Sequence, residues 1–263
     1  MSTVAFVFPG QGSQYVGMGH DLAAMSPAAA AVFAEADAAL GERLSALAWE
    51  GEAAQLDLTV NAQPALLATS IAYLRALDER RAAQGAAPLR PAFYAGHSMG
   101  QYTAMVAAGA LSVADGVRLV RERGQLMQAS GSGRDGAMAA IIGLDDARLP
   151  DVDAVGKAAG VFTIANRNSP GQVVVSGERA AVQAAAEAAK GLGAKRAIVL
   201  PVSVAAHSPL MAKAALGMRA ALADITFRAP VAPLLANADA RLLTTAHGRG
   251  SPRWIGLAVG VSR

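Results

Sequence analysis

The 263-residue chain contains no cysteine and only four histidines. The missing thiols exclude disulfide bonds, thiolate metal sites and a cysteine nucleophile. With so few histidines, scattered along the chain, a histidine-rich metal site is a poor expectation. Charged residues are sparse at 16%, whereas 53% of the residues are hydrophobic, so we expect a globular protein with a large buried core.

Long runs of one residue class are also missing. The chain has no basic run of five or more residues and no uninterrupted apolar run of about 18 residues, which argues against nucleic-acid binding and a membrane span. The start, MSTVAFVFPGQGSQ, lacks the basic region of a signal peptide, and we expect a cytoplasmic protein. The net charge of +3 suits an ordinary solvated surface or the docking of an acidic partner.

The hydrophobic pattern predicts an α/β protein. Short apolar runs at residues 4–8 and 92–95 are typical of buried parallel strands. Helices are predicted at residues 20–40, 64–81 (beginning at Pro64), 101–109 and 115–129. A flexible link follows near residue 130, and strand-like segments then surround helical ones for roughly seventy residues. This change indicates a small α+β subdomain inserted into a larger α/β domain.

The segment GHSMG at residues 96–100 follows a predicted strand and precedes a predicted helix. This is the arrangement of a nucleophile elbow, in which glycines let the helix pass close to the strand. Ser98 Oγ would project at the N-terminal end of the helix, where the N–H of Met99 would donate to an oxyanion. The alternative is a glycine-rich turn that merely contains a serine.

A serine nucleophile needs a base, and two histidines come into question. His97 is adjacent in sequence, but neighbours on an elbow diverge, so we expect it to point away and pack. His207 lies in a loop after a predicted strand, where the sites of α/β proteins assemble. The alternative for His207 is a helix-capping or buried structural histidine.

Gln11 and Arg123 are two further candidates. Gln11 follows the first predicted strand in a tight loop, where its N–H or its side chain would reach an oxyanion, unless the loop is a plain turn. Arg123 lies on an otherwise apolar helix, where it would bind a carboxylate in bidentate fashion. The alternative is a surface arginine, as Arg118 and Arg121 nearby would be.

Five segments occur in the order and spacing of malonyl-CoA:acyl-carrier-protein transacylases: FPGQGSQ, GHSMGQY, RLVRERGQLMQ, NSPGQVVVSG and LPVSVAAHSPLM. The chain resembles this family, and the related acyltransferase domains of polyketide synthases, from residue 4 to about residue 244. The resemblance implies an α/β-hydrolase-like large subdomain with a parallel sheet, at residues 1–129 and 201–263. It also implies an inserted ferredoxin-like α+β subdomain at residues 130–200.

The resemblance further implies a ping-pong transfer of a malonyl group in fatty-acid or polyketide synthesis. The group passes from malonyl-CoA to a serine, and then to the phosphopantetheine thiol of acyl carrier protein. The implied roles are Ser98 as nucleophile, His207 as base, the N–H groups of Gln11 and Met99 as oxyanion hole, and Arg123 as carboxylate clamp. No cofactor or metal is implied beyond the phosphopantetheine of the partner, and we expect a monomer.

Three features depart from the family pattern. The elbow reads GHSMGQ where GHSLGE is commoner, and small residues precede His207 where a bulkier residue often stands in malonyl-selective relatives. Compared with the family pattern, we expect the acid-free ending, residues 241–263, to be truncated or divergent, and we find no residue there to match the amide that orients the histidine in relatives. One alternative is a serine thioesterase or esterase, which shares the elbow. The altered C-terminus suggests another, a non-catalytic module that binds the carrier protein.

Overall fold

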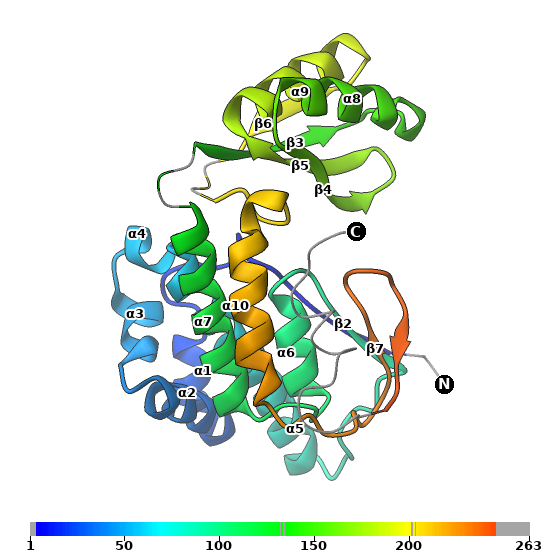
Figure 1. Ribbon diagram of the computed structural model, residues 1–263. Helices are drawn as coiled ribbons and strands as arrows, with labels where there is room; N and C mark the ends of the chain where they lie inside the picture. The colour runs from blue at the N-terminus through cyan, green and yellow to red at the C-terminus, as the bar shows by residue number, and fades with distance from the viewer. Residues whose placement is uncertain (1–3, 132, 134, 201, 203, 246–263) are drawn as a thin grey trace. The chain divides into compact units, whose positions relative to one another are not determined.

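The computed structural model describes residues 4–131, 133, 135–200, 202 and 204–245 (Figure 1). These residues form two compact units, which are treated separately below. One contains the chain up to Gln125 and the described residues from Met218 onward, and the other is Leu126–Gly217. Of the segment predicted to be truncated or divergent, residues 241–263, the part from residue 246 onward lies outside the described residues. In the described part of the chain, no helix is both long and apolar enough to cross a membrane.

The first unit is built on a mixed sheet in the order β1-β2-β7-β8. Its strands are β1 (Ala5–Phe8), β2 (Phe93–Gly96), β7 (Leu234–Leu235) and β8 (Leu242–Leu243). The pairs β1–β2 and β2–β7 are parallel, and β7–β8 is antiparallel. Phe8 is paired with Gly96, so β1 and β2 end at the same edge of the sheet. The loops that follow them, which carry Gln11 and Ser98, therefore start side by side.

Helices make up most of the rest of this unit. They are α1 (His20–Met25), α2 (Pro27–Leu40), α3 (Leu44–Glu50), α4 (Ala53–Leu56), α5 (Thr59–Ala83) and α6 (Gly100–Ala107). Two more, α7 (Val113–Gly131) and α10 (Ala212–Ala223), run across the boundary between the units. The predicted helix at residues 20–40 is two helices. Ser26 ends α1, and its side chain accepts from Ala29 N–H at 3.1 Å to cap α2.

The predicted start of α5 at Pro64 is wrong, because the helix begins at Thr59. The N–H groups of Asn61 and Ala62 both donate to the carbonyl of Leu58, which completes a helical turn ahead of the proline. Pro64 is buried inside the helix, where it lacks the N–H that would normally bond the preceding turn. Burial of this part of the helix therefore outweighs the proline, and it brings Thr59 into a regular helical position.

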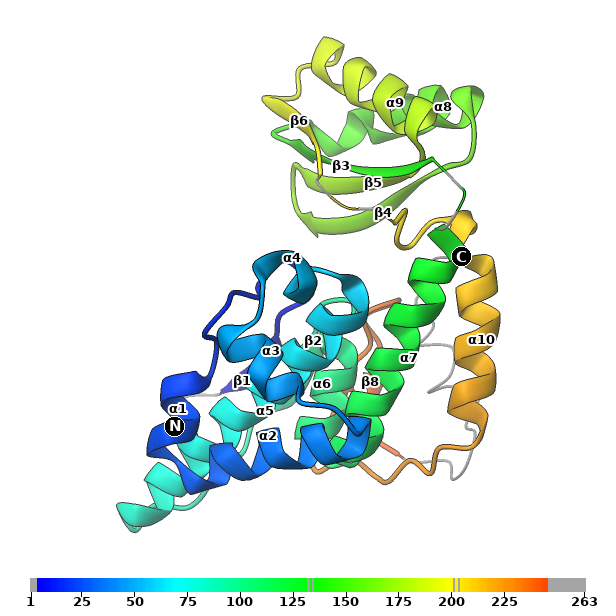
Figure 2. The same cartoon turned by 90° about the vertical axis from the view of Figure 1, so that its left-hand side faces the viewer.

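The second unit has the strand and helix order βαββαβ. Its elements are β3 (Gly136–Ile142), α8 (Leu149–Ala159), β4 (Phe162–Ser169), β5 (Gln172–Glu178), α9 (Arg179–Gly191) and β6 (Arg196–Val199). The sheet order is β4-β5-β3-β6 with antiparallel neighbours, and α8 and α9 cover one face (Figure 2). Ile141, Val175 and Phe162 are buried in the core between sheet and helices. The predicted flexible link is partly helical, because α7 continues to Gly131.

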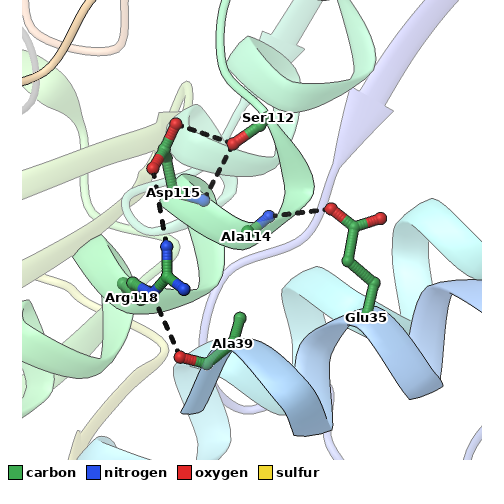
Figure 3. A network of polar contacts seen from close by, with 6 residues as sticks. All are labelled: Glu35, Ala39, Ser112, Ala114, Asp115 and Arg118. Atoms are coloured by element: carbon green, nitrogen blue, oxygen red, sulfur yellow. Dashed lines mark hydrogen bonds and ion pairs between the residues drawn. The ribbon is translucent and has the colours of Figure 1, made fainter.

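Polar contacts fix the start of α7 against α2 in the first unit (Figure 3). Glu35 Oε1 accepts from Ala114 N–H at 3.2 Å, and Arg118 Nε donates to the carbonyl of Ala39 at 3.0 Å. Arg118 also forms an ion pair with Asp115 at 3.9 Å. These contacts set the rotation of α7, the helix that carries the predicted carboxylate clamp.

Candidate active site

Ser98 forms a strained turn between β2 and α6. Its φ is 52°, in the left-handed region that non-glycine residues rarely adopt. A Cβ on Gly96 would lie 1.9 Å from the carbonyl oxygen of Gly100, and a Cβ on Gly100 would lie 2.5 Å from that of Phe8. Both positions therefore need glycine. Met99, 1% exposed, directly precedes α6, where the helix dipole favours negative charge. The geometry is that of a nucleophile elbow.

Arg123 reaches the elbow from α7. It is only 7% exposed, so the alternative of a surface arginine is wrong. Its Nη2 donates to Ser98 Oγ at 3.2 Å, and its Nη1 donates to Gln63 Oε1 at 2.8 Å. The neighbouring Arg118 and Arg121 instead form ion pairs with acidic side chains. A buried guanidinium beside a serine hydroxyl is suited to hold a carboxylate next to that hydroxyl.

A directed chain of hydrogen bonds connects Arg123 to Gln11. Gln63 accepts from Arg123 and donates through Nε2 to Thr59 Oγ1 at 2.8 Å. Thr59 in turn donates its hydroxyl to Gln11 Oε1 at 2.8 Å. Gln63 and Thr59 each accept one bond and donate the next, so the bonds polarise one another and fix the orientation of the Gln63 amide. The relay thus orders two of the predicted site residues, Gln11 and Arg123, relative to each other.

Burial shifts the two ionisable groups of this region toward their neutral forms. Burial lowers the pKa of Arg123, and Tyr102 acts in the opposite direction. Arginine still stays protonated at neutral pH, because its ordinary pKa is so high. Burial raises the pKa of Tyr102 to about 12, against the effect of Arg123. The site therefore holds one cation next to Ser98 and a neutral phenol.

The two candidate histidines, His97 and His207, lie in different surroundings. His97 is exposed rather than packed, contrary to the expectation. His207 lies in the second unit between β6 and the short helix Pro209–Met211, where it is partly exposed with φ 61°. Ser208 is the N-cap of this short helix and accepts from Leu210 N–H at 3.3 Å, so His207 does not cap that helix. The pairing of His207 with Ser98 stays a prediction.

Comparison with protein families decides the class. The model of the acyl transferase domain family matches residues 5–247, most of the chain. The chain belongs to the acyl transferase family. It is therefore a transferase enzyme, as the sequence motifs predicted.

Relatives of this acyl transferase carry consistent names. The malonyl CoA-acyl carrier protein transacylase of Escherichia coli K12 is 48% identical over 93% of this chain and 77% of its own length. The protein of the same name from Bacillus subtilis is 46% identical over 93% of this chain and 75% of its own length.

Solved structures agree with this acyl transferase in α/β fold. The acyl-carrier-protein-S-malonyltransferase of Bartonella henselae superposes with a TM-score of 0.89 at 43% identity, covering 100% of this chain and 82% of its own. A malonyl-transacylase in complex with its type II polyketide-synthase acyl-carrier protein gives a TM-score of 0.88 at 39% identity, with coverage of 100% and 82%.

Three polar residues of the acyl transferase site were missed by sequence reasoning: Thr59, Gln63 and Asn237. Gln63 is fully buried, but a buried glutamine has no signature in a sequence. Asn237 Oδ1 accepts from the N–H of Ser98 at 2.8 Å although the two residues are 139 positions apart. Only the fold could reveal these contacts. Among the described residues, no group of three His, Asp or Glu side chains is placed to hold a metal ion.

Proposed function

We propose that this acyl transferase moves a malonyl group from malonyl-CoA to the phosphopantetheine thiol of acyl carrier protein, with Ser98 as the nucleophile. The observation that carries the proposal is the buried Arg123 guanidinium, 3.2 Å from Ser98 Oγ. A three-carbon acyl group whose carboxylate binds Arg123 has its thioester carbonyl close to that hydroxyl. The names of the relatives support the same donor and acceptor.

The reaction runs in two half-reactions through a malonyl-serine ester. Ser98 Oγ attacks the thioester carbonyl while His207 accepts the hydroxyl proton. The C–S bond then breaks, and the proton goes to coenzyme A, which leaves as a thiol. In the second half, the carrier's thiol gives its proton to His207 and attacks the ester. The C–O bond to Ser98 breaks, and the hydroxyl recovers the proton.

Backbone N–H groups of Gln11 and Met99 stabilise the oxyanion in both half-reactions. Support comes from the common edge at which β1 and β2 end, because this edge brings the Gln11 loop to the elbow. The relay from Thr59 to Gln11 further orders that loop. Donors that are fixed before the reaction need no reorganisation as charge develops.

Preference for a carboxylated acyl group follows from the burial of Arg123. An acyl group without a carboxylate leaves the Arg123 charge in a desolvated place without an anionic partner, which is unfavourable. The neutral Tyr102 supplies no competing charge. A simple esterase or thioesterase has no use for such an arginine, so the transfer of malonyl groups is the better account.

We also propose the finer fold assignment that the family resemblance implies. The large α/β-hydrolase-like subdomain would comprise residues 1–129 and 201–263, and the ferredoxin-like subdomain residues 130–200. The order βαββαβ and the antiparallel sheet of the second unit support the latter. The compact units divide inside α7 and α10 instead, after Gln125 and after Gly217. The phosphopantetheine arrives on the partner, and the chemistry above requires no other cofactor.

Product analysis tests the proposal. The chain is mixed with malonyl-CoA and a phosphopantetheinylated acyl carrier protein, and the products are separated. Malonyl-carrier protein in wild type, absent with Ser98→Ala, is the expected result. Free malonate as the main product would identify a hydrolase, and no turnover with intact carrier binding would identify a non-catalytic module.

A further inference from the structure

Asn237 reaches the elbow from a distant part of the chain. The pairing of β2 with β7 is parallel, with Tyr94 opposite Leu234 and Ala95 opposite Leu235. The chain that leaves β7 therefore emerges at the edge of the sheet where β2 turns into the elbow. There the Asn237 amide oxygen accepts from the N–H of Ser98 at 2.8 Å.

The bonded N–H belongs to the strained residue of the site. A left-handed φ of 52° at a serine persists only where the surroundings hold it. The amides at the start of a helix also lack acceptors within the helix, and Ser98 stands just ahead of α6. Asn237 supplies such an acceptor, as an N-cap side chain does, but from another strand.

Asn237 is itself held in place by the helix that follows the elbow. Its N–H donates to Gln101 Oε1 at 2.8 Å, and Gln101 is 1% exposed. Within the described residues, the buried Nε2 of Gln101 has no hydrogen-bond partner. A turned Gln101 amide would place its NH₂ group against the Asn237 N–H, donor against donor, so its oxygen stays on Asn237 although its nitrogen goes without a bond. Hydrogen bonds through Asn237 thus connect Ser98, at the elbow, with Gln101 on the helix that follows it.

We propose that Asn237 is a positioning residue for acyl transfer. Its amide oxygen holds the Ser98 backbone in the elbow conformation and thereby fixes the direction of Ser98 Oγ. The inference rests on the proposed function, in which Ser98 is the nucleophile. Asn237 is not a catalytic residue in this account, because its amide oxygen bonds the backbone N–H of Ser98 and not the reacting hydroxyl.

A positioning role differs from a merely structural one in what a mutation changes. If Asn237 only stabilised the fold, its loss would reduce the fraction of competent molecules, and hence the amplitude of Ser98 acylation. If it aims the nucleophile, the loss lowers the rate constant of acylation at saturating malonyl-CoA. The half-saturating concentration stays constant, because Asn237 acts on Ser98 and not on the substrate.

The test is single-turnover acylation by malonyl-CoA, followed by quenching and intact-mass measurement. Asn237→Ala should keep the amplitude and lower the rate constant on the order of 10- to 100-fold. Asn237→Asp retains an acceptor oxygen of the same reach and should acylate faster than Asn237→Ala, although its negative charge keeps the rate constant below that of wild type. Asp239→Ala is the matched control, because Asp239 bonds Arg241 N–H at 3.2 Å in the same turn; its rate should equal that of wild type.

Several results overturn the proposal. One is a wild-type rate constant in Asn237→Ala; another is an Asn237→Asp variant as slow as Asn237→Ala at unchanged amplitude. If Asn237→Ala does not fold, Gln101→Met removes the acceptor that holds Asn237 and should also slow acylation, and a wild-type rate there contradicts the inference. An unacylated wild type would instead overturn the proposed function, so the two failures are distinguishable.

Discussion

At the scale of single residues, burial decides what Arg123 and Tyr102 can do. Removal from water disfavours the charged form of each, which lowers the pKa of the arginine and raises that of the phenol. The arginine nevertheless keeps its charge, while the phenol is neutral throughout the physiological range. The buried Arg123 cation attracts an anionic acyl group, and the neutral Tyr102 phenol adds no negative charge that would oppose its binding.

Replacement of Arg123 should change acyl selectivity. In Arg123→Ala, the ratio of kcat/KM for malonyl-CoA to that for acetyl-CoA should fall on the order of 100-fold, because the carboxylate loses its bidentate partner. Arg123→Lys keeps the charge but loses the planar fork, so an intermediate ratio is expected. An unchanged ratio in Arg123→Ala would remove the clamp from the account.

Tyr102 should make the protein sensitive to base. Its pKa is about 12 in the folded chain, against an ordinary value of 10.0. The folded state therefore holds the proton more tightly, and this stabilisation is complete below pH 10 and is lost as pH rises toward 12. The loss amounts to about 2 to 3 kcal/mol in the free energy of unfolding. Urea titrations from about pH 8 to 11.5 should show a steeper decline for wild type than for Tyr102→Phe. Equal declines in the free energy of unfolding of the two proteins would contradict the role given to Tyr102.

At the scale of elements, the start of α5 holds the site together. Thr59 accepts from Gln63 on its own helix and donates to Gln11 in the loop after β1. The loop and the helix that supports the clamp are thus connected through one hydroxyl.

Thr59→Val, which has nearly the same shape, should break this connection. The free energy of unfolding should fall by about 1 to 3 kcal/mol, because buried polar groups lose their partners. Thr69→Val is the control on the same helix. Thr69 Oγ1 is buried without a partner among the described residues, so this change should be neutral or stabilising. Equal losses of stability in the two variants, measured by urea unfolding, would mean that the relay does not contribute.

The sequence predicted these elements unevenly. The strand expected at residues 4–8 is confirmed as β1, since a short apolar run before Pro-Gly has few other structures available. Its expected burial is wrong: β1 ends the order of the described strands, and Val7 is 68% exposed. The predicted start of α5 at Pro64 was wrong, because burial of the first turns outweighs the local signal of a proline. The two-residue β7 is too short to show any periodicity, so the route that brings Asn237 to the elbow could not be predicted.

At the scale of the whole molecule, ordered motifs identified the family and the fold supplied the connections. The predicted family is confirmed by the match over residues 5–247. Motifs pointed to Ser98 and Arg123, because a tight turn and an arginine on an apolar helix leave a local pattern. Gln63 and Asn237 left none, because their importance lies in hydrogen bonds between segments far apart in the chain.

The central claim is that Ser98 carries the acyl group between donor and acceptor. Its most direct measurement is the intact mass of the chain after mixing with malonyl-CoA alone, followed by peptide mapping. The account predicts one malonyl group per chain, on the peptide that contains Ser98, and none on Ser98→Ala. An unmodified wild type, or a malonyl group that persists in Ser98→Ala, would contradict it.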